Sequence, residues 1–245
     1  MKFGIIVFPG SNCDRDVAWV TQGLLGQPTR MIWHQEEDIS DIDVIVIPGG
    51  FSYGDYLRCG AIARFSTVMK ATINHAQQGK LVVGICNGFQ ALVKLGLVPW
   101  GEIGDMNESS PTLTFNRIGR HINRMIPTRI TSVLSPWFAC HKVGDITTIP
   151  ASHGEGCFIA QPEIMAQLVE KGQIATQYVD IQGNPSNHIA HNPNGSMYAV
   201  EGITSPDGRI LGKMGHSERI TSNTAINIPG DKDQKLFESG VSYFS

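Results

Sequence analysis

Short aliphatic runs alternate along the first hundred residues with stretches in which apolar residues recur at helical spacing. The aliphatic runs predict buried strands at residues 3–8, 29–33, 43–48 and 81–85. The helical spacing predicts helices over residues 13–24, ended by Gly26, and over residues 68–76. Because strands that alternate with helices form parallel sheets covered by helices, this part of the chain predicts a doubly wound α/β fold.

The pattern changes after Pro99. Residues 112–118 and 128–133 are strand-like, and Gly, Pro, Ser and Asn become more frequent between such runs. The segment Ser205-Pro-Asp-Gly208 joins two further strand-like runs, 197–203 and 209–214, with Pro and Gly where a tight turn favours them, so it predicts a β-hairpin. The tail from Asn223 to Ser245 is polar and irregular except at residues 235–244, and one interpretation is that it docks on a partner.

Composition excludes several classes of protein. The chain has 245 residues, of which 41% are hydrophobic, and a net charge of −3, as expected of a globular protein. Its 19 basic residues form no concentrated block, so nucleic acid is not expected as a partner. The apolar run at residues 1–10 is too short for a signal peptide core or a membrane span and is broken at Pro9. We therefore expect a cytoplasmic protein with no membrane association.

Five cysteines of irregular spacing argue against a disulfide framework and favour reduced thiols: Cys13, Cys59, Cys86, Cys140 and Cys157. A metal site could be built from Cys140, His141, His153 and Cys157. Neither a CxxC nor an HxxxH pair anchors it, however, and small buried thiols and loop histidines are the simpler interpretation. No metal is expected.

One cysteine lies where a strand gives way to a helix, in Gly84-Ile85-Cys86-Asn87-Gly88. This spacing matches the sharp strand-to-helix turn that presents a nucleophile, with small residues on either side of a strained central position. The positive end of the following helix would favour a thiolate, and its first N–H groups, that of Asn87 foremost, could receive an oxyanion. The plainer alternative is a small residue in a tight turn.

A second glycine loop, Pro48-Gly49-Gly50-Phe51, ends another predicted parallel strand. By the rule for open α/β sheets it lies on the same carboxyl edge as Cys86. A backbone N–H of Gly50 or Phe51 could then be the second oxyanion donor. The turn at Cys86 and the second glycine loop thus point to one crevice at the carboxyl edge of the sheet.

A thiolate nucleophile needs a base, and the base needs an orienting acid. Of eight histidines, only His216 directly follows a predicted strand with an acid, Glu218, two residues later. Residues i and i+2 of an extended backbone point the same way, so Glu218 can reach the imidazole. An exposed loop histidine beside a surface acid is the alternative. His153, with Glu155 at the same spacing, is the rival base.

Six segments of the chain carry a family resemblance: FPGSNCDRD, PGGFSYGDYLRCGAIAR, GICNGFQALVKLG, ASHGEG, NPNGS and HSER. They resemble the glutaminase components of phosphoribosylformylglycinamidine (FGAM) synthases, which are class I glutamine amidotransferases. The resemblance runs from Phe3 to about Arg219, in the order of that family. The resemblance implies an amidotransferase domain over residues 1–222 and a tail over 223–245. It also implies a flavodoxin-like α/β fold, with a mostly parallel central sheet flanked by helices and an added β-hairpin-rich region.

The same resemblance implies an activity and its partners. Such a component hydrolyses L-glutamine and delivers ammonia to an ATP-dependent synthetase subunit or domain in de novo purine biosynthesis, and a small bridging subunit would be a further partner. This chain would hold no cofactor, and ATP and Mg²⁺ would bind to the synthetase. Cys86 would be the nucleophile, His216 the base and Glu218 the orienting acid, with His153 in a supporting role. Phe51 and Asn87 would form the oxyanion hole.

Further residues follow from the resemblance. Gln90, four residues past Cys86 and on the same face of the helix, would bind the substrate together with Gly50, and Asn116 is a further candidate. Arginines 117, 120, 124 and 129 either face the synthetase or lie on solvated strand faces. Many members of the family have prolines on both sides of the histidine, where this chain has Gly215 and Ser217, so the sequence leaves open what holds that loop rigid.

Three other functions compete with this one. One is a class I amidotransferase with another acceptor, since glutamine hydrolysis is common to many of them. A second is a flavodoxin-like cysteine hydrolase or chaperone-like protein, in which a histidine typically follows the cysteine closely; Asn87 argues against it. The third is a non-catalytic scaffold, which the intact Cys86, His216 and Glu218 disfavour.

Overall fold

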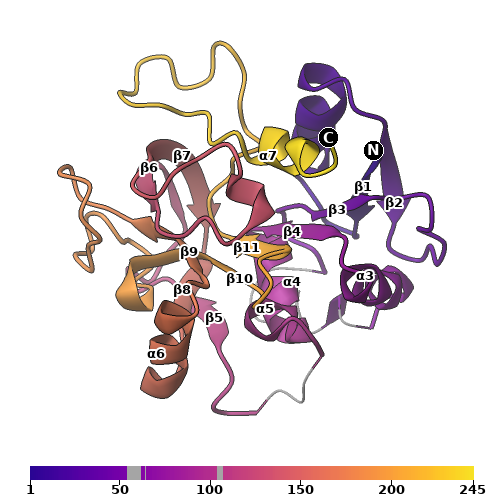
Figure 1. The fold of residues 1–245 in the computed structure, drawn as a ribbon. Coiled ribbons are helices and arrows are strands. Elements are labelled where there is room, and N and C mark those ends of the chain that lie inside the picture. Colours follow the sequence, from indigo (N-terminus) through magenta and orange to yellow (C-terminus); the bar gives the residue numbers. More distant parts are fainter. Residues whose placement is uncertain (54–61, 64, 104–106) are drawn as a thin grey trace.

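The computed structural model describes residues 1–53, 62, 63, 65–103 and 107–245 (Figure 1), so Cys59 lies outside the described residues. In chain order its strands and helices are β1 (Phe3–Val7), α1 (Asp14–Ala18), η1 (Trp19–Leu24), β2 (Thr29–Trp33), β3 (Val44–Ile47), α3 (Thr67–Gln77), β4 (Leu81–Ile85), α4 (Asn87–Leu95), α5 (Leu97–Trp100), β5 (Thr112–Phe115), β6 (Ile122–Ile130), η2 (Pro136–Phe138), β7 (Ile146–His153), β8 (Glu155–Ile159), α6 (Pro162–Glu170), β9 (Ile174–Tyr178), η3 (Met197–Ala199), β10 (Val200–Thr204), β11 (Ile210–Lys213) and α7 (Leu236–Ser242). Within these ranges no helix is long and apolar enough to cross a membrane.

A nine-stranded sheet in the order β2-β1-β3-β4-β11-β10-β9-β6-β7 forms the centre of the molecule. The first five strands of this order run parallel to their neighbours. They follow the flavodoxin-type order, in which the chain reverses direction across the sheet between β1 and β3. In Figure 1 helix α7 lies on one face of the sheet, and α3, α4 and α5 lie on the other. The predicted α/β class is confirmed, and β3 is buried at all four residues, as its unbroken aliphatic run predicts.

The other half of the sheet is antiparallel and contains the predicted hairpins. Strands β10 and β11 pair on either side of a turn in which the Gly208 N–H donates to the Ser205 carbonyl at 3.0 Å. Gly208 has a φ of +76°, a conformation that glycine adopts without strain. Strand β11 also pairs in parallel with β4, opposing Lys213 to Ile85. The hairpin therefore brings the chain that follows β11 to the carboxyl end of β4.

Several element boundaries differ from the prediction, and the strand predicted at residues 112–118 ends at Phe115. The strand predicted at residues 128–133 is the end of the longer β6, whose first part the sequence conceals because Pro127 interrupts its aliphatic pattern. Residues 197–199 form a 3-10 turn before β10. The helix predicted from residue 13 becomes a π-helix at Trp19, close to where the Thr21 hydroxyl donates to the Val17 carbonyl at 2.9 Å.

The tail packs into the main core, although the sequence predicts a domain boundary at residue 222. Leu236 and Phe237 on α7 are buried in the same core as β1, and the rings of Phe3 and Phe237 lie 6.4 Å apart between centroids. Figure 1 accordingly places the two termini near each other. A seven-residue helix after a polar stretch carries little sequence signal, and its burial depends on contacts with distant residues. Between residue 221 and α7 the chain forms a mostly exposed loop.

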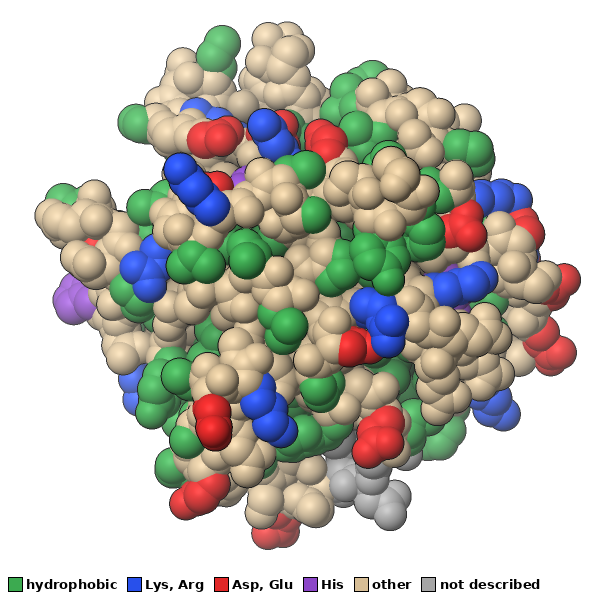
Figure 2. Space-filling model, viewed as in Figure 1, with side chains coloured by type: hydrophobic (Ala, Val, Ile, Leu, Met, Phe, Trp, Pro, Cys, Tyr) green, Lys and Arg blue, Asp and Glu red, His purple; other side chains and the backbone are tan. Residues whose placement is uncertain are grey.

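The charged surface is mixed. On the described part of the face in Figure 2, basic and acidic side chains are interspersed rather than gathered by sign. Two of the four arginines considered as partner contacts donate hydrogen bonds to loops of this chain, Arg124 to the Ala190 carbonyl and Arg129 to the Gly183 carbonyl at 3.4 Å. These two therefore support the loop that follows β9.

Replacing Phe237 by alanine tests whether the tail belongs to the core. We expect Phe237→Ala to lower the free energy of unfolding by about 3–5 kcal/mol, since it leaves a cavity between α7 and β1. Phe244→Ala is the matched control, because this ring is 40% exposed, and it should change stability by about 0.5 kcal/mol or less. Urea denaturation of both variants measures the difference, and equal effects would contradict the assignment.

Candidate active site

Cys86 occupies the junction of β4 and α4 in a left-handed backbone conformation, with φ of +53° and ψ of −104°. Such angles are strained for a residue with a side chain. The two flanking glycines allow it, because a Cβ on Gly88 would lie 1.9 Å from the Ile47 carbonyl oxygen and one on Gly84 would lie 2.6 Å from the Gly88 carbonyl. The turn predicted from the glycine spacing is confirmed.

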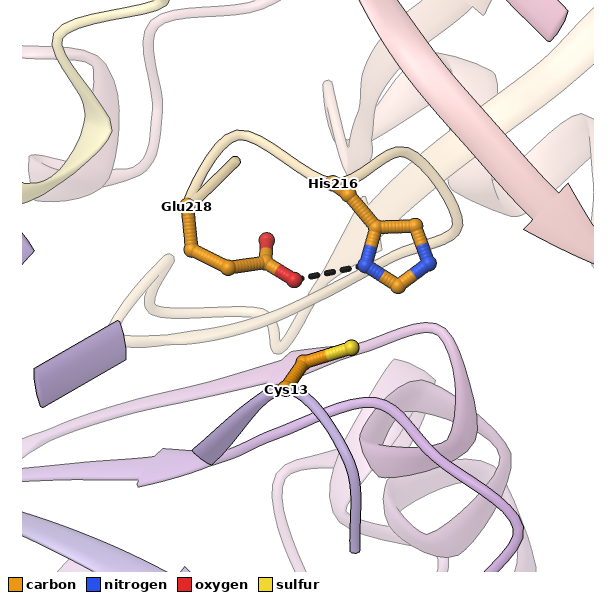
Figure 3. A group of neighbouring side chains, drawn as sticks. All are labelled: Cys13, His216 and Glu218. Carbon is orange, nitrogen blue, oxygen red and sulfur yellow. Dashed lines mark hydrogen bonds and ion pairs between the residues drawn. The ribbon is translucent and has the colours of Figure 1, made fainter. Parts of the chain in front are cut away.

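His216 and Glu218 lie on the loop after β11. The His216 Nδ1 and Glu218 Oε1 atoms are 2.6 Å apart, and both side chains are buried. Figure 3 shows the carboxylate reaching the imidazole from two residues along the chain. The predicted contact between acid and base is confirmed.

Nucleophile and base meet around Gly49, in the loop after β3. A Cβ on Gly49 would lie 2.8 Å from His216 Cε1 and 3.3 Å from both Cys86 Cβ and Cys13 Sγ. A side chain at position 49 would therefore clash with the His216 ring and crowd both cysteines. The structure thus brings together segments that are far apart in the sequence, as the argument from the carboxyl edge of the sheet requires.

The histidine and its acid form a charged pair. Burial alone would lower the pKa of His216, but the charge of Glu218 and the nearby sulfur atoms of Cys13 and Cys86 raise this pKa well above its ordinary value. Burial likewise opposes ionisation of Glu218, and the imidazolium outweighs it and lowers the carboxyl pKa. Within the described part of the chain the buried Nε2 of His216 has no hydrogen-bond partner, so this nitrogen is placed to exchange a proton.

His153 is unsuited to be the base. It is buried, and burial followed by the charges of His216 and His121 lowers its pKa to about 3. Its Nε2 lies 3.4 Å from the side-chain nitrogen of Asn194. A neutral, enclosed imidazole lining the pocket fits the supporting role better than proton transfer.

The site opens into a small pocket at the carboxyl edge of the sheet. Its lining includes Gly50, Phe51, Cys86, Gln90, Ser152 and His216. The Gln90 side chain donates to the Glu155 carbonyl at 2.7 Å and accepts from the Asn87 side chain at 3.1 Å. The thiol of Cys86 donates to the Ser152 carbonyl at 3.7 Å. Two of the three residues predicted to bind substrate, Gly50 and Gln90, therefore face the pocket.

Asn116, the third, is not among the residues that line this pocket, and its contact with substrate stays a prediction. Its amide nitrogen donates to the carbonyls of His153 at 2.7 Å and Arg120 at 3.1 Å. Its amide oxygen accepts from the Gly156 N–H at 3.0 Å. Because both ends of its side-chain amide are hydrogen-bonded to the backbone, Asn116 stabilises the turn between β7 and β8, which follows His153.

The two predicted oxyanion donors differ in availability. The Asn87 N–H belongs to the first turn of α4, where backbone donors have no partner within the helix. The Phe51 N–H instead donates to the Gly10 carbonyl at 2.9 Å. Phe51 can serve an oxyanion only after this hydrogen bond opens, so its role stays a prediction.

Sequence reasoning missed Cys13 and Arg219. Cys13 precedes α1, and in Figure 3 its sulfur points toward the imidazole. One ligand atom each of Cys13, His216 and Glu218 lies within 4.8 Å of the others, which resembles a metal site. Arg219, however, donates to the Cys13 sulfur at 3.2 Å, and a guanidinium there opposes a cation. The sequence signal was present in FPGSNCDRD, which follows β1 at the same edge of the sheet.

Replacing Glu218 by glutamine tests the charged pair. Without the carboxylate, burial should dominate and the pKa of His216 should fall from well above its ordinary value to below it. We expect the kcat of the reaction that uses Cys86 to fall about 10²- to 10⁴-fold, because His216 loses both the partner that orients its ring and the charge that balances its own. Titration of the His216 ring nitrogens by NMR measures the pKa. Glu170→Gln, on the exposed end of α6, is the control and should leave both quantities unchanged. A native-like His216 titration in Glu218→Gln would exclude this role for the carboxylate.

Comparisons with known proteins agree with this geometry. Residues 1–244 match the model of the CobB/CobQ-like glutamine amidotransferase domain. The chain is 51% identical over 241 residues to the phosphoribosylformylglycinamidine synthase subunit PurQ of Acaryochloris marina, covering 98% of this chain and 95% of that protein. It is 47% identical to the PurQ subunit of Trichormus variabilis, covering 97% and 96% of the two chains.

Solved structures give the same result. A chain in the structure of PurLQS from Thermotoga maritima superposes with a TM-score of 0.78 at 28% identity, covering 100% of this chain and 99% of that one. A putative GMP synthase component from Thermoplasma acidophilum, at 13% identity and a TM-score of 0.61, shares the fold. The chain therefore is a glutamine amidotransferase and belongs to the family of PurQ subunits of phosphoribosylformylglycinamidine synthase.

Proposed function

We propose that this chain hydrolyses L-glutamine through a thioester on Cys86 and passes the ammonia to the synthetase of the same enzyme. The observation that carries the proposal is the meeting of Cys86, His216 and Glu218 around Gly49. Three buried groups with these chemistries, at the carboxyl edge of a parallel sheet, are what acyl transfer from an amide requires.

The first half of the reaction forms the thioester. The Cys86 thiolate attacks the γ-carbonyl carbon of glutamine, and a carbon–sulfur bond forms as the carbonyl electrons move to oxygen. The carbonyl then re-forms, the carbon–nitrogen bond breaks, and the His216 imidazolium gives its Nε2 proton to the departing nitrogen, which leaves as ammonia. The raised pKa of His216 suits this step, because the proton is in place before the attack.

The second half reverses the proton flow. Neutral His216 takes a proton from water, and the resulting hydroxide attacks the thioester. Glutamate leaves, and the thiolate and the imidazolium are restored. Glu218 keeps Nδ1 hydrogen-bonded throughout, so that Nε2 remains the nitrogen that exchanges the proton.

Charge on the carbonyl oxygen is stabilised at the start of α4. The Asn87 N–H and the helix dipole face the position of the attacking sulfur, and one such donor is worth about 2.7–4 kcal/mol of barrier lowering. Gly50 and Gln90 line the same pocket and are proposed to hold the α-amino and carboxylate ends of glutamine. The oxyanion role of Phe51 requires its bond to Gly10 to open first.

The acceptor of ammonia is proposed from the relatives. The PurQ relatives are named as subunits of phosphoribosylformylglycinamidine synthase, and the Thermotoga assembly is named PurLQS. We infer that this chain works with an ATP-dependent synthetase and a small bridging subunit, and that ATP and Mg²⁺ bind to the synthetase. A free, buried thiol nucleophile suits a reducing compartment such as the cytoplasm.

A reconstituted assay tests this function. The chain is mixed with the synthetase and bridging subunits of a PurQ-containing relative, formylglycinamide ribonucleotide, ATP and Mg²⁺, and amidine formation is followed with glutamine or ammonium as nitrogen donor. Cys86→Ala should abolish the glutamine-dependent reaction and leave the ammonium-dependent reaction near its native rate. Cys140→Ala, which removes an exposed thiol, is the control and should keep both. Glutamine-dependent turnover in Cys86→Ala would refute the assigned nucleophile.

A further inference from the structure

A fully buried ion pair contacts the residues on either side of His216. Lys213 ends β11 and Glu201 lies on the adjacent β10, and Lys213 Nζ is 3.2 Å from Glu201 Oε1. Both side chains have no exposed surface. Burying two charges gains little net stability, because their desolvation offsets most of their attraction. The contacts that these two side chains make point to another role.

Nearly all of those contacts go to the residues on either side of His216. Lys213 Nζ donates to the Gly215 carbonyl at 2.7 Å and to the Ser217 hydroxyl at 3.0 Å. Glu201 Oε1 accepts the Gly215 N–H at 2.6 Å, and the other carboxylate oxygen accepts the hydroxyl of Thr176. The ion pair therefore fixes the chain immediately before and immediately after the histidine.

A second set of bonds holds the same loop from the C-terminal segment. The Ser217 hydroxyl donates to the side-chain carbonyl of Gln234 at 2.5 Å, and Gln234 donates to the Thr147 hydroxyl at 3.3 Å. The His216 N–H donates to the Pro150 carbonyl at 2.8 Å. Ser217 is thus bonded both to the ion pair and to Gln234.

A proline in place of Gly215, before His216, could not make the same hydrogen bonds. Proline at position 215 has no N–H and would remove the hydrogen bond that Glu201 accepts from the backbone there. Any Cβ at this position would also lie 2.2 Å from Ile149 Cδ1. With glycine before the histidine and serine after it, the loop depends on hydrogen bonds for its shape.

We propose that Lys213 and Glu201 are positioning residues that hold His216 at the working distance from Cys86, acting as a clamp through Gly215 and Ser217. The proposal rests on the proposed function of His216 as the proton-transfer group. A base displaced by about 1 Å loses up to about a hundredfold in rate, even when the substrate still binds. The clamp therefore acts on kcat and on the reactivity of the sulfur, while the pocket around Gln90 keeps its affinity for glutamine.

Ser217→Ala tests the clamp because it removes the hydrogen bond through which Lys213 holds the chain after His216, and leaves the ion pair and its contacts with Gly215 in place. Ser205→Ala is the matched control, since it removes another buried hydroxyl, also with two hydrogen bonds, at the other end of the same hairpin. Each full-length variant is assayed for kcat and KM in the reconstituted complex. Each is also treated alone with iodoacetamide over a range of pH, and alkylation of Cys86 is followed by mass spectrometry.

We expect Ser217→Ala to lower kcat about 10- to 100-fold with KM within about twofold of native. Its alkylation profile should shift toward that of His216→Ala. Ser205→Ala should keep the native kcat and profile even where its melting temperature falls. The double variant Lys213→Met/Glu201→Gln, which removes both charges together, should lose kcat in the same way; where it fails to fold, Ser217→Ala decides.

Native kcat and a native alkylation profile in Ser217→Ala would overturn the proposal. The alkylation of His216→Ala separates this failure from that of the proposed function. If His216→Ala reacts like the native chain, the imidazole does not act on the sulfur, and the assigned mechanism fails. If His216→Ala differs and Ser217→Ala does not, only the clamp fails.

Discussion

The site depends on one strained residue, Cys86, whose left-handed backbone turns the chain from β4 into α4. Strain of this kind costs about 1–3 kcal/mol and persists only where the surrounding structure leaves no other conformation. Here Gly88 packs against β3, and the Cys86 N–H donates to the Lys213 carbonyl of β11 at 2.7 Å. The hydrogen bond that fixes Cys86 thus also fixes the strand that leads to His216.

His216 and Glu218, on the loop after β11, contribute to stability with opposite dependence on pH. The raised pKa of His216 favours the folded state fully below its ordinary value of 6.5, and this contribution is lost as the pH rises through the raised pKa. The lowered pKa of Glu218 favours the folded state above its ordinary value of 4.5, and this contribution is lost as the pH falls through the lowered pKa. Their attraction is therefore fully available between these two values and persists above them until His216 loses its proton.

Much of this site could be predicted because its signals are local. The run from Val44 to Ile47, the spacing of Gly84 and Gly88, and the acid two residues after His216 each act through neighbouring positions. Other parts depend on distant contacts. Cys13 reaches the imidazole because its N–H binds the Gly49 carbonyl at 3.1 Å, a contact between two loops that neither segment reveals alone. The partners of Asn116 and of the tail are likewise far along the chain, so neither segment reveals them alone.

The meeting of β1 with α7 has a consequence for biosynthesis. The ribosome adds Gln234 and Phe237 after both Cys86 and His216, whereas Phe3 comes before them all. During translation, Cys86 and His216 therefore leave the exit tunnel ahead of the segment that packs against β1. The contact between α7 and β1 can form only after both residues have been synthesised.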